Sequence, residues 1–380
     1  MNMIKRNLEK LLVSRLNKGK ALVVLGARQT GKTTLIKEIL HGKADDTLML
    51  NCDEPHVRER LTSVSSASLK QMIGKKKFLF IDEAQRVKNI GLTLKLITDT
   101  VDHTQLIVSG SSSLDIADEV NEPLTGRKYE YTLYPISLLE LLQHRDLIAV
   151  QGELDRRIVY GMYPDVIMHA GEEEEILRNL SGSYLYKDIL SFRDVRKPAV
   201  LEKLLQALAF QVGSQVSLNE LSSLVGIDKG TVETYIQLLE KAFIIFRLPP
   251  LNRNLRTEIA SSRKIYFWDT GIRNAIISNF NPMNLRNDAG ALWENFILVE
   301  RLKYRRYQGK AFNIFFWRTY QQQELDYTEE QGGKLHAFEF KWNPTTRFRF
   351  PKTFTDAYPS STMEVITREN LWSFIGWENV

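Results

Sequence analysis

Cysteine is almost absent from this sequence, and long apolar runs are absent altogether. Cys52 is the single cysteine among 380 residues, so no internal disulfide can form. No run of about 18 apolar residues occurs, which argues against a membrane span. The first seven residues also lack the apolar region and cleavage site of a signal peptide. We therefore expect a cytoplasmic protein that has no membrane partner.

Basic residues slightly outnumber acidic residues. The 51 basic and 46 acidic residues give a formal net charge of +5, which permits contact with nucleic acid without requiring it. The hydrophobic fraction of 43% and the charged fraction of 26% are those of a globular protein. A chain of 380 residues exceeds one ordinary core, so two or three domains are expected.

Short apolar runs alternate with helical stretches in the first part of the chain. Such runs are typical of strands buried on both faces, and intervening helices imply a parallel sheet. We expect these strands over residues 21–25, 47–51, 78–82, 105–109 and 130–134. The middle of the chain is predicted to be helical and to contain a helix-turn-helix, with helices over 218–225 and 231–242. Later strands are expected over 264–268, 312–317 and 335–341, with a helix over 291–304.

A phosphate-binding loop follows the first expected strand. Its residues match G-x-x-x-x-G-K-[ST] in full, between a strand and a helix as the motif requires. Glycines let the backbone wrap around phosphate oxygens, and the loop amides and the helix N-terminus present positive potential. The residues expected to bind the nucleotide here are Gly26, Ala27, Arg28, Gln29, Thr30, Gly31, Lys32, Thr33 and Thr34. Lys32 would add charge at the β and γ phosphates, and Thr33 would ligate magnesium.

Two carboxylates end the third expected strand. Asp82 would help to hold magnesium and Glu83 would orient the attacking water. Asp-Glu after a strand usually means a strand that meets solvent, but after a phosphate-binding loop it indicates an ATPase site. Ser109 and Ser111 end the next strand, where a hydroxyl would sense the γ-phosphate; a serine-rich turn is the alternative. Arg127 is either an ordinary surface arginine or one supplied to the ATP of a neighbouring subunit in a homo-oligomer.

Taken together, these motifs resemble those of prokaryotic AAA+ ATPases that carry a C-terminal domain of unknown function. Further on, Lys264-Ile265-Tyr266-Phe267-Trp268-Asp269-Thr270-Gly271 and Gly290-Ala291-Leu292-Trp293-Glu294-Asn295 resemble motifs of that second domain. The resemblance implies an α/β fold with an AAA+ parallel-sheet core over residues 1–140. It also implies a helical region with a winged helix over 141–255 and a C-terminal α/β domain related to restriction endonucleases over 256–380. Ser109 would be part of the sensor, Arg127 an arginine finger and Asn51 a polar switch residue.

Within that resemblance, Glu294, Asp326, Glu339 and Lys341 follow the order of a PD-(D/E)xK nuclease site. Carboxylate oxygens could hold a hard cation there. Glu339 and Lys341 would share one face of a strand because side chains alternate, so Lys341 could activate water beside the metal. The alternative is a strand face that keeps these residues without nuclease activity.

Two basic runs are candidate contacts for nucleic acid. The first contains Arg301, Lys303, Arg305, Arg306 and Lys310, and the second contains Arg347, Arg349 and Lys352 between Phe348 and Phe350. Basic side chains would meet phosphates and aromatic rings could stack on bases, but a solvated helix face with core aromatics explains the pattern equally well. In the helix-turn-helix, Glu233 and Glu240 on the second helix disfavour DNA reading and favour a packing or subunit-contact role.

The function that we expect is binding and hydrolysis of ATP with Mg²⁺, coupled to the nuclease-like C-terminal domain, with DNA as a candidate partner. One alternative is a non-catalytic adaptor that binds a protein partner under the control of ATP. Another is an ATP-regulated, metal-dependent nuclease.

Overall fold

The computed structural model describes residues 3–111, 124–185, 198–251 and 263–377. The chain divides into two compact units. The first contains residues 2–136 and 241–243, and the second contains residues 137–240 and 244–380. Within the described ranges, no helix is both long enough and apolar enough to span a membrane. The division into three domains at residues 140 and 255 stays a prediction.

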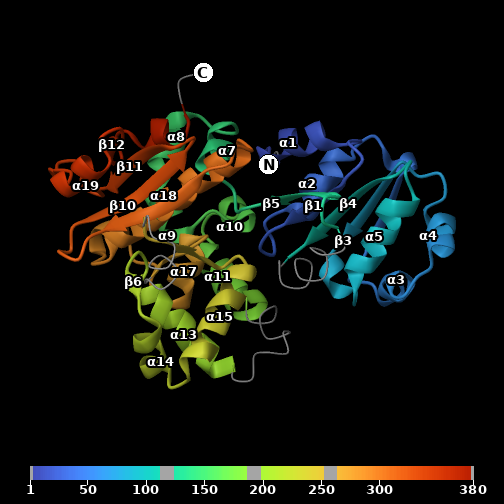
Figure 1. Cartoon of the computed structure of the whole chain (residues 1–380), viewed down its shortest axis with the longest axis horizontal. Coiled ribbons are helices and arrows are strands. Elements are labelled where there is room, and N and C mark those ends of the chain that lie inside the picture. The colour runs from blue at the N-terminus through green and yellow to red at the C-terminus, as the bar shows by residue number, and fades with distance from the viewer. Residues whose placement is uncertain (1–2, 112–123, 186–197, 252–262, 378–380) are drawn as a thin grey trace. The chain divides into compact units, whose positions relative to one another are not determined.

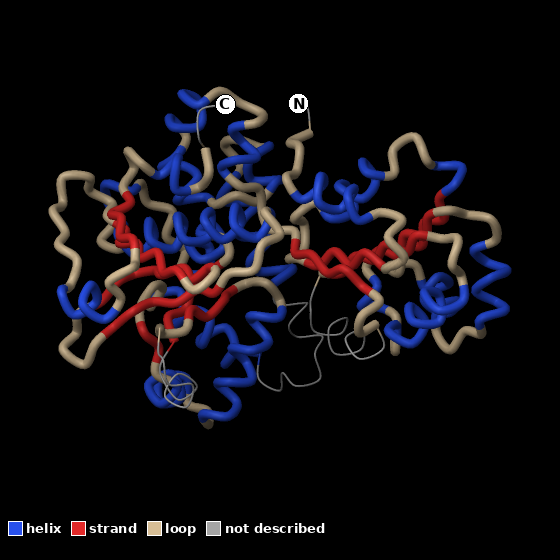
Figure 2. Tube along the Cα trace, turned by 45° about the horizontal axis from the view of Figure 1, so that its top comes forward, coloured by secondary structure: helices blue, strands red, loops and turns tan. Residues whose placement is uncertain are grey.

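The first unit is built on a parallel sheet of five strands, which are drawn as arrows in Figure 1 and in red in Figure 2. Its strands are β1 (Ala21–Leu25), β2 (Thr47–Asn51), β3 (Phe78–Asp82), β4 (Gln105–Gly110) and β5 (Lys128–Thr132). They lie in the order β2-β3-β4-β1-β5, and each neighbouring pair is parallel. The expectation of a parallel α/β sheet is confirmed, with β5 two residues earlier than expected.

Helices cover the apolar faces of this sheet. They are α1 (Leu8–Arg15), α2 (Lys32–Ile39), α3 (Pro55–Leu61), α4 (Ser66–Ile73) and α5 (Ile90–Thr100), with short 3-10 turns η1 (Ala44–Asp46) and η2 (Ala84–Arg86). Val23 and Leu79 share one buried cluster with Leu69 of α4 and Leu94 of α5. Leu22, on the other face, is also buried. Because the strands are parallel, the carboxyl ends of β1, β3 and β4 meet at one edge of the sheet.

The second unit begins with a helical region. Its elements are α7 (Leu138–Leu142), α8 (Leu147–Gly152), α9 (Leu154–Tyr160), α10 (Pro164–Met168), α11 (Glu173–Asn179), the π-helix η3 (Leu180–Leu185), α13 (Pro198–Phe210), α14 (Leu218–Val225) and α15 (Lys229–Lys241). Helices α14 and α15 form the expected helix-turn-helix. The second helix starts two residues earlier than expected because the Asp228 side chain accepts a hydrogen bond from the Thr231 amide at 2.9 Å.

A small antiparallel sheet flanks the helix-turn-helix. Its strands β6 (Gln215–Val216), β7 (Ile245–Leu248) and β8 (Arg263–Phe267) lie in the order β6-β8-β7. The strand expected at 264–268 therefore pairs with segments on either side of α14 and α15, and not with the later strands.

The remaining elements form a four-stranded mixed sheet with its helices (Figure 1). They are α17 (Thr270–Ile276), η4 (Met283–Leu285), α18 (Ala289–Tyr307), β9 (Asn313–Arg318), β10 (Glu324–Gln331), β11 (Lys334–Phe340), α19 (Lys352–Ala357), β12 (Thr362–Ile366) and α20 (Leu371–Phe374). The sheet has the order β12-β11-β10-β9; β9, β10 and β11 are antiparallel, and β12 runs parallel to β11. No strand bounds were predicted from the sequence over the residues of β10 and β12.

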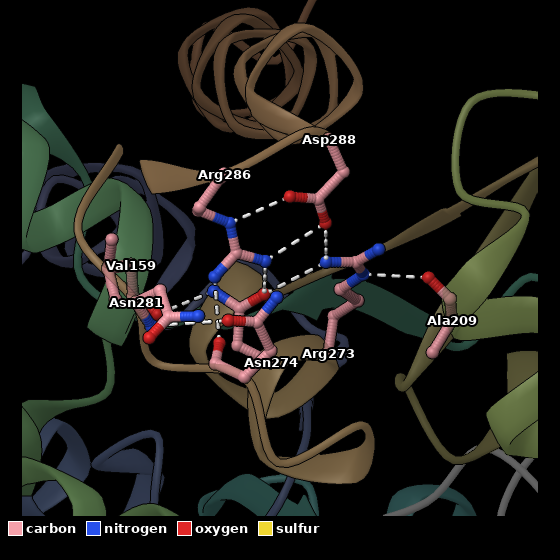
Figure 3. Close-up of polar contacts among 8 residues, drawn as sticks. Val159, Ala209, Arg273, Asn274, Asn281, Arg286 and Asp288 are labelled. Carbon is pink, nitrogen blue, oxygen red and sulfur yellow. Dashed lines mark hydrogen bonds and ion pairs between the residues drawn. The ribbon is translucent and has the colours of Figure 1, made fainter. Parts of the chain in front are cut away.

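One carboxylate joins two buried guanidinium groups at the start of α18 (Figure 3). Asp288 accepts hydrogen bonds from Arg286 Nε at 2.8 Å and from Arg273 Nη1 at 2.5 Å. Burial by itself would raise the pKa of Asp288, but the hydrogen bonds from Arg286 and Arg273 outweigh it and hold that pKa below its ordinary value. The ionised form of Asp288 is therefore the one that the fold stabilises.

The same network reaches two other helices through backbone carbonyls (Figure 3). Arg273 Nε donates to the Ala209 carbonyl of α13 at 2.7 Å, and the Asn274 amide donates to the Val159 carbonyl of α9 at 2.7 Å. Arg286 Nη2 also donates to Asn274 Oδ1 at 3.0 Å. Helices α9, α13, α17 and α18 are thus tied together by charged and amide side chains from one short segment.

Replacing Asp288 by Asn tests this network. We expect Asp288→Asn to lower the free energy of unfolding of the second unit by roughly 3 kcal/mol at pH 7, because two buried guanidinium groups lose their carboxylate. Since the folded pKa of Asp288 is depressed, its contribution is present above the unfolded value of about 3.9 and is lost as the pH falls through the folded value. Chemical denaturation measures the difference, with the exposed Asp356→Asn as control. Equal stability of the two variants would contradict the assignment.

Candidate functional site

The loop between β1 and α2 has a backbone that depends on glycine. Gly26 has a φ of 151°, and a Cβ atom there would lie 2.2 Å from the Leu133 carbonyl oxygen, so a larger residue does not fit. Gly31, with a φ of 93°, is the N-cap of α2. Gln29 between them also has a positive φ, of 59°. The loop therefore turns sharply and directs the N-terminus of α2 toward its concave side.

Internal hydrogen bonds hold this loop in shape. Lys32 Nζ donates to the carbonyls of Gly26 and Ala27, both at 2.9 Å, and its side chain is buried. Thr30 is also buried, and its hydroxyl donates to the Ala27 carbonyl at 2.9 Å. Arg6, which the sequence did not single out, donates to the Thr30 carbonyl at 2.7 Å. The lysine ammonium therefore already lies against the loop that is expected to bind phosphate.

The remaining residues expected in the loop differ in exposure. Ala27 is buried, Arg28 is half-buried, and Gln29 and Thr34 are exposed. Thr33 is half-buried, and its hydroxyl contacts Asp82 at the end of β3.

The carboxylates that end β3 meet hydroxyl and amide groups from neighbouring segments. Asp82 Oδ2 accepts a hydrogen bond from the Thr33 hydroxyl at 2.8 Å, and Asp82 Oδ1 accepts one from the Ser109 hydroxyl. Glu83 Oε2 accepts a hydrogen bond from Gln85 Nε2 at 2.6 Å. The structure thus brings Thr33, Asp82, Glu83 and Ser109 to one edge of the sheet, together with Gln85, which the sequence reasoning missed.

This edge of the sheet has the oxygen ligands and the positive charge that a magnesium-bound nucleotide needs. The Thr33 hydroxyl oxygen and the Asp82 carboxylate oxygen are 2.8 Å apart, and oxygen ligands of this kind suit Mg²⁺. Lys32 and the amides at the start of α2 supply positive charge for phosphate. The residues present therefore fit a magnesium ion and a nucleoside triphosphate.

Arg127 lies at the amino ends of the strands, whereas the phosphate-binding loop follows a carboxyl end. It precedes β5, and the next residue, Lys128, pairs with Ala21 at the start of β1. Arg127 Nε donates to Asp99 at 2.7 Å, and its side chain is 46% exposed. An arginine at the amino ends of the strands is remote from the phosphate-binding loop of its own chain, so the two readings of Arg127, a surface arginine or one supplied to a neighbouring subunit, both stay predictions.

The acidic residues expected in the C-terminal region surround a buried lysine. Lys264 of β8 lies 3.2 Å from Glu294 Oε1, 2.5 Å from Glu324 Oε1 and 3.7 Å from Asp326 Oδ1. Its side chain is only 2% exposed. Burial by itself would lower the pKa of Lys264, but the nearby carboxylates outweigh it and keep that pKa well above its ordinary value. An ammonium ion that belongs to the chain therefore neutralises part of this acidic cluster.

Glu339 and Lys341 lie at the other side of this cluster. Lys341 Nζ donates to Glu339 Oε1 at 2.6 Å, while the buried Glu339 Oε2 has no hydrogen-bond partner among the residues described. Asp326 Oδ2 accepts a hydrogen bond from the Phe340 amide at 2.9 Å. Burial above all, and then the charge of Asp326, raises the pKa of both Glu294 and Glu339 to about 7.

This cluster does not fit a divalent metal ion. Across the described ranges, no three His, Cys, Asp or Glu side chains are placed to hold a metal. A divalent ion would also have to share Glu294 and Asp326 with the fixed charge of Lys264, which repels it. Lys264 could not be recognised from the sequence, because a lysine at the start of an apolar strand is usually a residue that meets solvent.

Three residues of the first basic run pair with acidic residues of their own unit, whereas Arg306 and Lys310 are exposed. Arg301 and Arg305 both contact Glu329, at 2.7 and 3.3 Å, and Lys303 contacts Glu300 at 2.7 Å. The Arg301, Lys303 and Arg305 side chains are at most 14% exposed. For these three residues, both predictions, a nucleic-acid surface and a solvated helix face, are therefore wrong.

The second basic run remains at the surface. Phe348 and Phe350 are half-buried and pack against the core cluster of the mixed sheet, whereas Arg347, Arg349 and Lys352 are exposed. In the helix-turn-helix, Arg247 of β7 contacts Glu233 at 2.5 Å and Glu240 at 2.6 Å. Glu233 and Glu240 of α15 are therefore paired with Arg247 of β7, and the packing or subunit-contact role of the helix-turn-helix stays a prediction.

Three family models match successive parts of the chain. Residues 18–142 match a model described as "AAA domain". Residues 151–283 and 289–373 match two domains of unknown function, DUF8612 and DUF4143. The first match supports a P-loop ATPase domain of the AAA+ class at the N-terminal end. The last match does not show the restriction-endonuclease-like fold that we expected.

Relatives of the chain share most of its length. An uncharacterized protein of Mycobacterium tuberculosis is 28% identical over 338 residues, covering 87% of this chain and 72% of the relative. An uncharacterized protein of Haemophilus influenzae is 24% identical over 302 residues, covering 74% of each chain.

Solved structures with some similarity include AMPPCP-bound DnaA from Aquifex aeolicus, which is 15% identical with a TM-score of 0.30 and covers 62% of this chain and 86% of that one. Cdc6p from Pyrobaculum aerophilum is 12% identical with a TM-score of 0.28, and the match covers 72% of this chain and 93% of that one.

The raised pKa of Glu339 leads to a prediction about pH. Because Glu339 is expected to titrate near 7 in the folded state and near 4.5 when unfolded, its stabilising contribution is complete below about 4.5 and is lost as the pH rises to 7. We expect Glu339→Gln to reduce this loss, by up to about 1.4 kcal/mol per pH unit. Denaturation of the second unit between pH 4.5 and 8 measures it.

The exposed Glu369→Gln is the matched control for that substitution and should keep the wild-type pH dependence. A profile that Glu339→Gln leaves unchanged would show that Glu339 ionises normally in the folded protein.

Proposed function

We propose that this protein binds and hydrolyses ATP and uses the nucleotide state to control its second unit. The observation that carries the proposal is the contact between Thr33 and Asp82 beside Glu83. A hydroxyl, a carboxylate and a second carboxylate are arranged at one sheet edge, where the N-terminus of α2 and the ammonium of Lys32 favour phosphate. The match of residues 18–142 to an AAA domain supports the same reaction.

Each residue of the site has a distinct role in this proposal. Lys32 would exchange its loop carbonyls for phosphate oxygens, while Thr33 and Asp82 would hold the magnesium ion. The ion supplies neutralising charge at the β and γ phosphates. Glu83 would position water for attack on the γ-phosphorus, and Ser109 keeps Asp82 oriented.

For the second unit, we propose a binding role under nucleotide control and not metal-dependent cleavage. The observation that favours this is Lys264, whose ammonium lies among Glu294, Glu324 and Asp326. The exposed cations Arg347 and Arg349 favour nucleic acid as a partner, through its phosphates. A metal-dependent nuclease remains the rival function.

Substitution of Glu83 tests the ATPase. We expect Glu83→Gln to lower kcat about 100-fold or more, because the residue that positions the water loses its charge, while ATP affinity stays within about threefold. Magnesium-dependent phosphate release and equilibrium nucleotide binding are the measurements. The control is Glu59→Gln, an exposed glutamate of the same unit. Absence of turnover in the wild type, with ATP still bound, would exclude the ATPase and favour a nucleotide-gated adaptor.

The same assay separates the candidate partners. Turnover that single- or double-stranded DNA stimulates would support action on nucleic acid, and turnover indifferent to DNA would indicate a protein partner. Incubation of labelled DNA with Mg²⁺ or Mn²⁺ tests the rival nuclease. Cleavage that Glu339→Ala abolishes would establish the nuclease and contradict the binding role.

Arg127 can be tested by complementation. We propose that it completes the ATP site of a neighbouring subunit in a homo-oligomer, because it lies at the opposite sheet edge from its own loop. Arg127→Ala should then lower kcat by about 1000-fold. Mixing it with Glu83→Gln should restore turnover, because mixed neighbours pair an intact Glu83 with an intact Arg127. The exposed Arg60→Ala is the control. Mixtures that stay inactive would rule out action between subunits.

A further inference from the structure

Gln85 is the one polar residue of η2 that contacts the carboxylate expected to position water. Residue Glu83 has a positive φ of 53°, which turns the chain between β3 and η2. That turn lets the Gln85 side chain reach back two residues, and its Nε2 donates to Glu83 Oε2 at 2.6 Å. A carboxylate held by a charge-assisted hydrogen bond has a fixed direction.

The orientation of the Gln85 amide follows from its neighbours. The Glu83 carboxylate can only accept, so the amide must present its nitrogen to it. The second hydrogen of Nε2 is donated to the Ser111 hydroxyl at 2.8 Å. Gln85 Oε1 is buried and has no hydrogen-bond donor among the described residues. A buried acceptor of this kind is costly unless a donor such as an ordered water meets it.

Through Ser111, Gln85 connects Glu83 to the strand beside it. Ser111 directly follows β4, the strand whose Ser109 hydroxyl donates to Asp82 and accepts from the Glu83 amide at 3.4 Å. The end of β4 therefore contacts both carboxylates at the end of β3. A shift of this end on γ-phosphate contact would be transmitted to the Glu83 side chain through Gln85.

Asn51 does not make this connection, although the resemblance to AAA+ ATPases implied a switch residue at its position. Its side-chain Oδ1 accepts a hydrogen bond from the Asp53 amide at 3.0 Å and so closes a turn in its own segment. Within the described ranges, the side chain that hydrogen-bonds to the Glu83 carboxylate comes from Gln85.

We propose that Gln85, braced by Ser111, is the positioning residue that holds Glu83 for ATP hydrolysis and couples it to the end of β4. This inference rests on the proposed ATPase function. Gln85 acts through Glu83, so its removal should lower kcat and leave nucleotide binding intact. Displacement of a catalytic group by about 1 Å can cost on the order of 100-fold in rate.

The test compares kcat and KM for Gln85→Ala, Gln85→Asn and Ser111→Ala with the wild type. We expect Gln85→Ala to lower kcat at least about tenfold with KM within about twofold. Gln85→Asn keeps the amide but is too short to reach both partners, so it should fall between Gln85→Ala and the wild type, and Ser111→Ala should have a smaller effect. The exposed Gln71→Ala is the matched control.

A second measurement shows whether Gln85 works through Glu83. In the Glu83→Gln background, Gln85→Ala should change the residual turnover by less than about twofold, because the group that it holds is already inactive. If Gln85→Ala lowers the residual turnover of the Glu83→Gln variant as much as it lowers the kcat of the wild type, the proposal is overturned. A kcat of Gln85→Ala that equals or exceeds that of the wild type would also overturn it. If the wild type itself does not turn over ATP, the ATPase and this inference are both overturned, whereas turnover retained in Gln85→Ala overturns the inference alone.

Discussion

The hydrogen bonds accepted by Asp82 are the interaction on which the candidate ATP site depends. They join the end of β3 to the start of α2, through Thr33, and to the end of β4, through Ser109. These three segments meet only because the strands are parallel and their carboxyl ends lie at one edge. The loop after β1 lies close to the Leu133 carbonyl that follows β5, because Gly26 has no Cβ atom. Sheet direction, one glycine and one carboxylate together position the site.

In the second unit, carboxylates are paired with buried guanidinium groups, whereas Asp82 in the first unit accepts hydrogen bonds from hydroxyl groups. Asp288 is enclosed by two guanidinium groups, and Glu329 by Arg301 and Arg305. Each ion pair has lost most of its hydration, so removing one partner leaves an uncompensated charge and costs far more than a surface pair. Residues that look like a basic surface in the sequence can therefore be structural, and their number says little about nucleic-acid binding.

The sequence predicts what is encoded locally. Strands β1 to β4 follow from apolar runs of about five residues, and the phosphate-binding loop follows from a motif of eight residues with a strand and a helix beside it. Strand β10 is hard to recognise because four of its eight residues, Glu324, Asp326, Glu329 and Glu330, are acidic, and acidic residues are depleted in strands. Gln85 and Lys264 acquire their roles from partners that are distant in sequence or on another strand, such as Ser111 and Glu294. Pairings of this kind carry no local signal.

The two carboxylate clusters differ in what neutralises them, and this difference decides which of them can take a cation. Asp82 is met by two hydroxyl groups, which are uncharged and can themselves become ligands when an ion arrives. Asp326 and Glu294 share the ammonium of Lys264, whose side chain is buried. Gain of a divalent ion at the second cluster would place it against a fixed positive charge in a medium of low dielectric. Under the proposed function, carboxylates would therefore hold a cation at Asp82, whereas at Asp326 they are paired with a lysine of the chain itself.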